Sequence, residues 1–117
     1  MNKKIILALR DLGVPANLLG YEYLKDSISL CMKDQSYQQA LTKRLYPDVA
    51  HAHKTTAMRV ERAIRHTIET AWIRGNPETL EQYFGWTVSG HQGKPTNGAF
   101  IATVVEQLRM EQEADGK

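Results

Sequence analysis

The stretch PDVAHAHKTTAMRVERAIRHTIETAWIRG, from Pro47 to Gly75, constrains the fold of this chain more than any other segment. It predicts a short helix, a tight turn and a long second helix. Pro47 suits the first turn of a helix, where its missing N–H has no partner to lose. Thr55 and Thr56 are both good N-caps for the second helix. Gly75 stands where a helix can end in a left-handed conformation.

The second predicted helix is amphipathic, because its apolar residues recur at intervals of three and four. One side carries a core face: Val60, Ala63, Ile64, Thr67, Ile68 and Ala71. The opposite side carries Met58, Glu61, Arg62, Arg65 and Glu69, with Arg59 and His66 on a flank. The first face is suited to a protein core, and the second is suited to solvent or a partner.

The two predicted helices, which span about residues 47–74, match the packing pattern of a helix-turn-helix. Ala50 is small enough to let the two helices cross closely, so that Val60 can pack against the first helix. This register places Glu61, Arg62 and Arg65 on the face that a recognition helix turns to the DNA major groove. The turn contains Lys54 where many such motifs have glycine, so a left-handed conformation there would carry strain.

Charge distribution adds to this reading, although a net charge of +2 alone does not indicate nucleic acid. Residues 43–74 contain seven Lys or Arg against three acids, whereas residues 106–117 contain four acids against two bases. Positive charge is therefore gathered on the predicted helix-turn-helix, as phosphate binding requires.

The rest of the chain predicts an all-α, compact single domain over residues 1–117, with about six helices and no strand-like alternation. The other helices are expected at residues 3–12, 17–33, 37–46, 77–84 and from Asn97 onward. Asn76 and Asn97 are the expected N-caps of the last two. Residues 86–96 are expected to form a loop, and the end of the chain is expected to fray from Glu111.

Several function classes are disfavoured. No nucleophile elbow, phosphate loop or paired-carboxylate motif is present, so we expect no enzyme and no cofactor. His51 and His53 do not share one helical face, and a zinc site is not expected. Cys31 is the only cysteine and falls on an apolar stripe, which indicates a buried residue in a reduced compartment. No apolar run is long enough for a membrane span, so a cytoplasmic location is expected.

Three ordered segments carry a family resemblance: TTAMRVERAIRHTIETAWIRGN, FGWTVS and KPTNGAFIATVVEQLRME. Together with GVPANLLGYEYLKDSISL and LTKRLYPDVA upstream, they resemble the DNA-binding effector domain family of the stage-zero sporulation protein A. That family belongs to the response regulators that start sporulation in Gram-positive bacteria. The resemblance runs from about Ile5 to Glu111, and it makes sequence-specific DNA binding the leading expectation.

The resemblance implies a set of DNA contacts. Arg59, Glu61 and Arg62 match the positions that read bases in a GTCGAA-like site, and their side chains suit guanine and cytosine. The DNA backbone is expected to contact Thr55, Thr56, Arg65, His66 and Lys94. For His66, simple solvation is the alternative. Met58 departs from the small polar residue that is usual in the family.

The resemblance also implies protein partners. Thr79, Phe84 and Val88 match a patch that touches the sigma subunit of RNA polymerase, although a helix start, a core aromatic and a loop anchor explain them equally well. The chain has no room for the family's receiver domain, so we expect double-stranded DNA to be bound by a monomer or by tandem copies, without a phosphorylation switch. The alternative function is an all-α interaction module that binds sigma factor or the full-length regulator.

Overall fold

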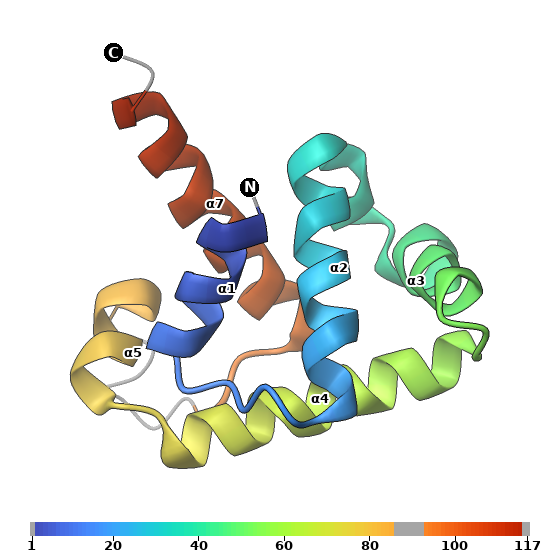
Figure 1. Cartoon of the computed structure of the whole chain (residues 1–117), viewed down its shortest axis with the longest axis horizontal. Helices are drawn as coiled ribbons and strands as arrows, with labels where there is room; N and C mark the ends of the chain where they lie inside the picture. The colour runs from blue at the N-terminus through green and yellow to red at the C-terminus, as the bar shows by residue number, and fades with distance from the viewer. Residues whose placement is uncertain (1, 86–92, 116–117) are drawn as a thin grey trace.

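The computed structural model describes residues 2–85 and 93–115, which form six α-helices and no strand. This confirms the predicted all-α fold. The helices are α1 (Asn2–Asp11), α2 (Leu19–Lys33), α3 (Tyr46–Ala52), α4 (Ala57–Arg74), α5 (Pro77–Phe84) and α7 (Asn97–Asp115) (Figure 1).

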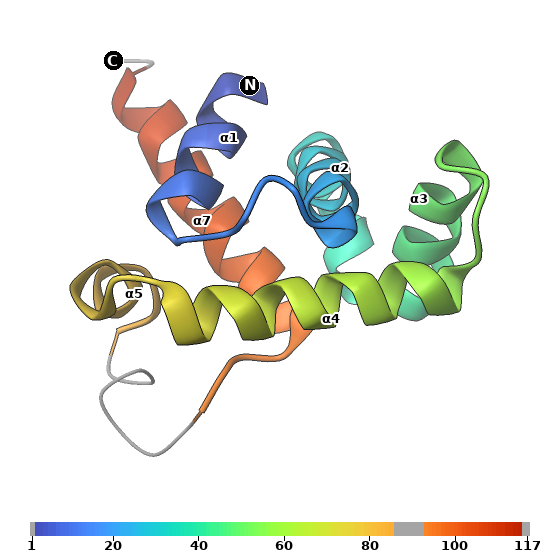
Figure 2. The same ribbon diagram turned by 60° about the horizontal axis from the view of Figure 1, so that its bottom comes forward.

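Helix α4 forms the base of the molecule. Helices α2 and α7 stand against it, α1 packs on α2 and α7, α3 lies beside its first turns, and α5 lies at its far end (Figures 1 and 2). The predicted core face of α4 is confirmed, since five of its six members are buried and Ala63 is half-buried. Fully buried side chains from α1, α2 and α7 complete the core, among them Leu9, Ile28, Phe100, Val104 and Leu108.

Helices α2 and α4 cross with almost no space between their backbones. Gly20 makes this possible: a Cβ atom at that position would lie 2.1 Å from Thr67 Oγ1 and 2.2 Å from the Ala63 carbonyl oxygen. The Thr67 hydroxyl is itself held in place, because it donates a hydrogen bond to that carbonyl at 2.8 Å. The position of α4 is therefore fixed by direct backbone contact with α2.

A continuous helix over residues 37–46 was the main error in the sequence prediction. The segment is broken at Ala40, whose backbone is not helical (φ −141°, ψ 51°). A 3-10 helix, η1 (Gln35–Gln39), precedes the break, and a π-helical turn, η2 (Leu41–Leu45), runs directly into α3. Tyr46 is helical (φ −62°, ψ −42°) although a proline follows it, so Pro47 lies within the first turn of α3 and ends no helix.

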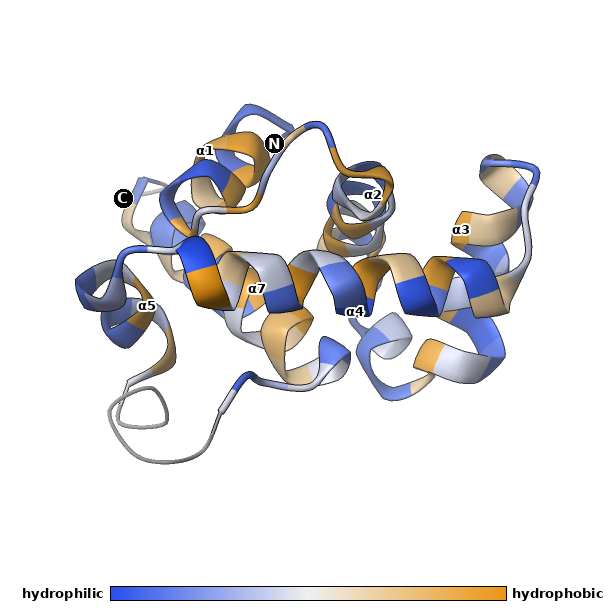
Figure 3. Ribbon diagram, turned by 90° about the horizontal axis from the view of Figure 1, so that it is seen from below, coloured by the Kyte–Doolittle hydropathy of each residue, from blue (hydrophilic) through white to orange (hydrophobic). Residues whose placement is uncertain are grey.

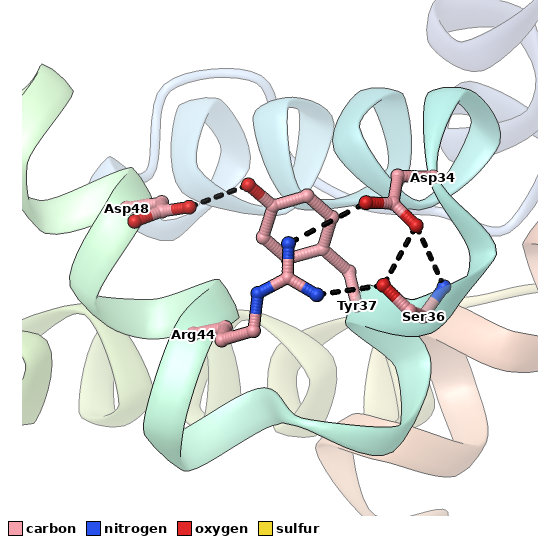
Figure 4. Close-up of polar contacts among 5 residues, drawn as sticks. All are labelled: Asp34, Ser36, Tyr37, Arg44 and Asp48. Atoms are coloured by element: carbon pink, nitrogen blue, oxygen red, sulfur yellow. Dashed lines mark hydrogen bonds and ion pairs between the residues drawn. The ribbon is translucent and has the colours of Figure 1, made fainter.

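A polar network explains the break, and Figure 4 shows it. The Arg44 guanidinium lies over the Tyr37 ring, 4.3 Å from its centroid, and donates to Ser36 Oγ at 2.6 Å and to Asp34 at 3.4 Å. The Tyr37 hydroxyl donates to Asp48 of α3. These contacts fold η1 back over η2, an arrangement that a straight helix could not provide.

Three helix termini also differ from expectation. Gly75 follows α4 in an extended conformation (φ −69°, ψ 159°), not a left-handed one. Glycine is required there for a different reason, because a Cβ atom would lie 2.9 Å from the Leu12 carbonyl oxygen. Thr96, and not Asn97, caps α7, since its hydroxyl accepts from the Ala99 N–H at 3.1 Å. Helix α7 does not fray at Glu111 but continues to Asp115.

Candidate nucleic-acid interface

Helix α3, the turn at residues 53–56 and helix α4 form the helix-turn-helix. Of the two N-caps that the sequence allowed, Thr56 caps α4, and its hydroxyl accepts from the Arg59 N–H at 3.2 Å. Half-buried Thr55 donates its backbone N–H to the Ala50 carbonyl at 2.9 Å. Lys54 has φ 55° and is the one non-glycine residue with positive φ within residues 2–85 and 93–115. The turn therefore has the expected left-handed residue, and because this residue is a lysine and not a glycine, its backbone is strained.

His53 ties this turn to α2. Its Nε2 atom lies 2.5 Å from an Asp26 carboxylate oxygen, and its ring meets the Tyr23 ring edge-on with centroids 4.9 Å apart. Both contacts reach α2, so the turn is held from outside the motif.

The exposed face of α4 begins at its first turn. Met58 is 64% exposed, and both Arg59 and Arg62 are exposed. Within the described part of the chain, neither arginine side chain has a hydrogen bond or an ion pair. Hydrophilic residues recur along the whole of α4 when it is viewed from below (Figure 3). Two exposed guanidinium groups that no described residue pairs with therefore lie on one side of the helix, near its N-terminus.

Further along α4 the charges are paired. Glu61 and Arg65 form an ion pair at 3.5 Å, one helical turn apart. Lys94, from the segment before α7, lies 4.0 Å from Glu69. His66 is exposed between these two pairs. The first pair joins neighbouring turns of one helix, whereas the second depends on how the chain folds back to α4.

Arg65 and Lys94 share the wall of an open depression of about 390 Å³. It lies between η2, α4 and the first turn of α7, and its wall also includes Tyr46, Glu61 and Asn97. Thr42 of η2 lines it too, and this was not expected, because the π-helical turn was not predicted. Two cationic side chains at the edge of a hollow beside α4 suit a phosphate group.

Two of the three predicted sigma-contact residues, Thr79 and Phe84, lie within the described residues, near the two ends of α5. Thr79 is half-buried in the first turn of α5, where the Asn76 side chain accepts from its N–H. Phe84 packs between the rings of Trp72 and Phe100, with centroid distances of 5.2 and 5.4 Å. Val88 lies outside the described residues.

Other chemistry is not evident in the described ranges. No group of three His, Cys, Asp or Glu side chains there is placed to hold a metal ion. Cys31 is fully buried, and burial raises the pKa of its thiol to about 11, so it is a poor nucleophile. None of the helices in residues 2–85 and 93–115 has the length and apolar content to cross a membrane.

Comparison with known families agrees with this geometry. A family model described as "Sporulation initiation factor Spo0A C terminal" matches residues 5–108. The match spans the helix-turn-helix and nearly all of the described core. The chain therefore belongs to the family of Spo0A C-terminal domains, the DNA-binding regulatory domains of sporulation initiation factors.

Proposed function

We propose that the chain works as one sequence-specific DNA-binding domain over residues 1–117, with α4 as the recognition helix in the major groove of a GTCGAA-like site. The observation that carries this proposal is the pair of exposed guanidinium groups of Arg59 and Arg62 near the start of α4, neither of which forms an ion pair with any described residue. A module that binds only proteins has no evident need for them. A helix-turn-helix uses this part of its second helix to reach base edges.

The chemistry of the three base-reading residues suits such a site. Arg59 and Arg62 can each donate two hydrogen bonds to guanine O6 and N7, and the Glu61 carboxylate can accept from cytosine N4. Glu61 is paired with Arg65 in the free protein. An exposed pair of this spacing contributes only about 0.3–0.5 kcal/mol, so DNA can displace it at little cost. Met58 adds an apolar group of the kind that contacts a thymine methyl.

The backbone contacts are proposed at both sides of this reading face. Thr55 and Thr56 lie at the N-terminus of α4, where unpaired N–H groups favour an anion. Arg65 and Lys94 flank the depression beside α4, and His66 is exposed next to Arg65. These residues would hold the register of the helix in the groove without reading sequence.

Binding should weaken steeply with salt. If four to six phosphates are neutralised, log affinity plotted against log salt should have a slope of roughly −4 to −5, because bound cations release counterions from DNA. Lys94→Gln should make the slope shallower by about 0.9 for its one lost phosphate contact. Arg74→Gln is the matched control: Arg74 is exposed at the α5 end of α4, and the slope should stay unchanged. Fluorescence anisotropy titrations would measure both, and affinity that is insensitive to salt would contradict DNA binding by this face.

We also propose that α5 carries the polymerase contact through Thr79. Helix α5 lies at the opposite end of α4 from α3 (Figures 1 and 2), so a protein could dock on α5 while α4 is bound to DNA. Thr79→Ala should lower transcription activation in a reconstituted assay and leave DNA affinity unchanged. Gln82→Ala, an exposed change on the same helix, should affect neither. Unchanged transcription, or weaker DNA binding, would remove the assignment. Phe84 is a poor probe, because truncating a packed aromatic can cost about 3–5 kcal/mol.

A further inference from the structure

Asn97 is the first residue of α7, but its side chain does not serve that helix. The Thr96 hydroxyl caps the helix, and the Asn97 side chain turns toward the helix-turn-helix. Its Nδ2 group donates to the Tyr46 hydroxyl oxygen at 3.1 Å and to the Glu61 carbonyl oxygen at 3.2 Å. One amide group therefore uses both of its N–H donors on residues far away in the sequence.

The two acceptors lie on the two helices of the motif. Tyr46 begins α3, and Glu61 lies in the second turn of α4. A helical carbonyl oxygen has a second lone pair, so Glu61 can accept from Asn97 without losing its own helical hydrogen bond. A tyrosine phenol is neutral at physiological pH, and burial raises the pKa of Tyr46 further. The link is therefore a fixed, uncharged tie between three helices.

We propose that Asn97 is a positioning residue for base recognition: it fixes the turn of α4 that carries Glu61 and Arg62 relative to α3 and α7. This inference rests on the proposed role of α4 as the recognition helix. Base reading needs side chains held within about 0.5 Å of their productive geometry. The Glu61 carbonyl belongs to the backbone of the turn that carries Glu61 and Arg62, so the hydrogen bond holds the part of α4 where small shifts would most affect base contacts.

The test compares Asn97→Ala with the unmodified protein on a GTCGAA duplex and on a duplex with a shuffled core. The ratio of the two affinities should fall about three- to tenfold, which corresponds to the net worth of one or two hydrogen bonds. The salt slope should not change, because Asn97 neutralises no phosphate. Thr96→Ala is the matched control: it removes the cap of the same helix one residue away, and it should lower thermal stability but keep the ratio.

A second variant tests the tie from its other end. Tyr46→Phe removes one acceptor and keeps the ring, so it should lower the same ratio by a smaller factor. In the Asn97→Ala background it should have no further effect, because the bond is already lost. All titrations are run at a temperature where circular dichroism shows each variant to be folded.

The outcomes separate the inference from the function on which it rests. If the unmodified protein prefers GTCGAA and Asn97→Ala keeps that preference in full, Asn97 does not position the reading turn. An equal fall of the affinity ratio in Asn97→Ala and Thr96→Ala would also overturn the inference, since it would show an effect of α7 stability alone. If the unmodified protein has no preference, the proposed function fails, and the inference fails with it.

Discussion

Arg62→Ala is expected to weaken binding to a GTCGAA duplex by about 1–3 kcal/mol and to relax the preference at one base pair. Arg62 is exposed on α4, one residue after Glu61, and no ion pair within the described ranges competes for its guanidinium. Folding should survive, because the buried side of the helix is formed by other residues. Titration on the cognate duplex and on one with the contacted guanine replaced measures the effect.

Arg65→Ala is the matched comparison on the same helix. It removes a proposed phosphate contact, so it should weaken binding to both duplexes about equally and reduce the salt slope by about one. It also removes the ion pair with Glu61, which is exposed to solvent and therefore contributes little to stability. Should Arg62→Ala weaken both duplexes by the same factor, Arg62 would be only an electrostatic contact, and its base-reading role would be wrong.

Gly20→Ala is expected to lower the free energy of unfolding by about 3 kcal/mol, the upper end of the usual overpacking range. The added Cβ would lie 2.2 Å from the Ala63 carbonyl oxygen. That atom belongs to the α4 backbone and cannot rotate away, so α2 and α4 must separate. Chemical denaturation followed by circular dichroism measures the change.

Gly98→Ala provides the control for this prediction. A Cβ at Gly98 would meet only Leu41 side-chain atoms, at 3.7 Å or more, which is an ordinary contact. Because alanine is the better helix former, this change in α7 should raise stability by about 0.5–1 kcal/mol. If Gly20→Ala were as stable as the unmodified protein, the close crossing of α2 and α4 would not be a constraint on the fold.

The helix-turn-helix was predictable because its signals are local. The apolar spacing of α4 extends over about three turns, so the buried face from Val60 to Ala71 followed from periodicity alone. Residue type limited the N-cap of α4 to Thr55 or Thr56, and the structure has Thr56 there. Periodicity placed Arg62 on the exposed face and Arg59 on its flank, whereas the base-reading roles of Arg59, Glu61 and Arg62 came from the family resemblance.

The errors arose where distant residues decide local structure. Leu41 and Leu45 have helical spacing, but the stacking of Arg44 on Tyr37 breaks the helix at Ala40. Thr96 and Asn97 are both capping residues by type. The Asn97 side chain instead bonds Tyr46 of α3 and the Glu61 carbonyl of α4. Such contacts leave no periodic trace in the sequence.

Base reading by α4 is tested most directly by titrating the unmodified protein on two duplexes that differ only in the GTCGAA core. At one fixed salt concentration, three base contacts worth at least about 1 kcal/mol each predict a preference of roughly 100-fold or more for the intact core. Equal affinity for both duplexes would contradict base reading by Arg59, Glu61 and Arg62. Binding would then rest on phosphate contacts alone.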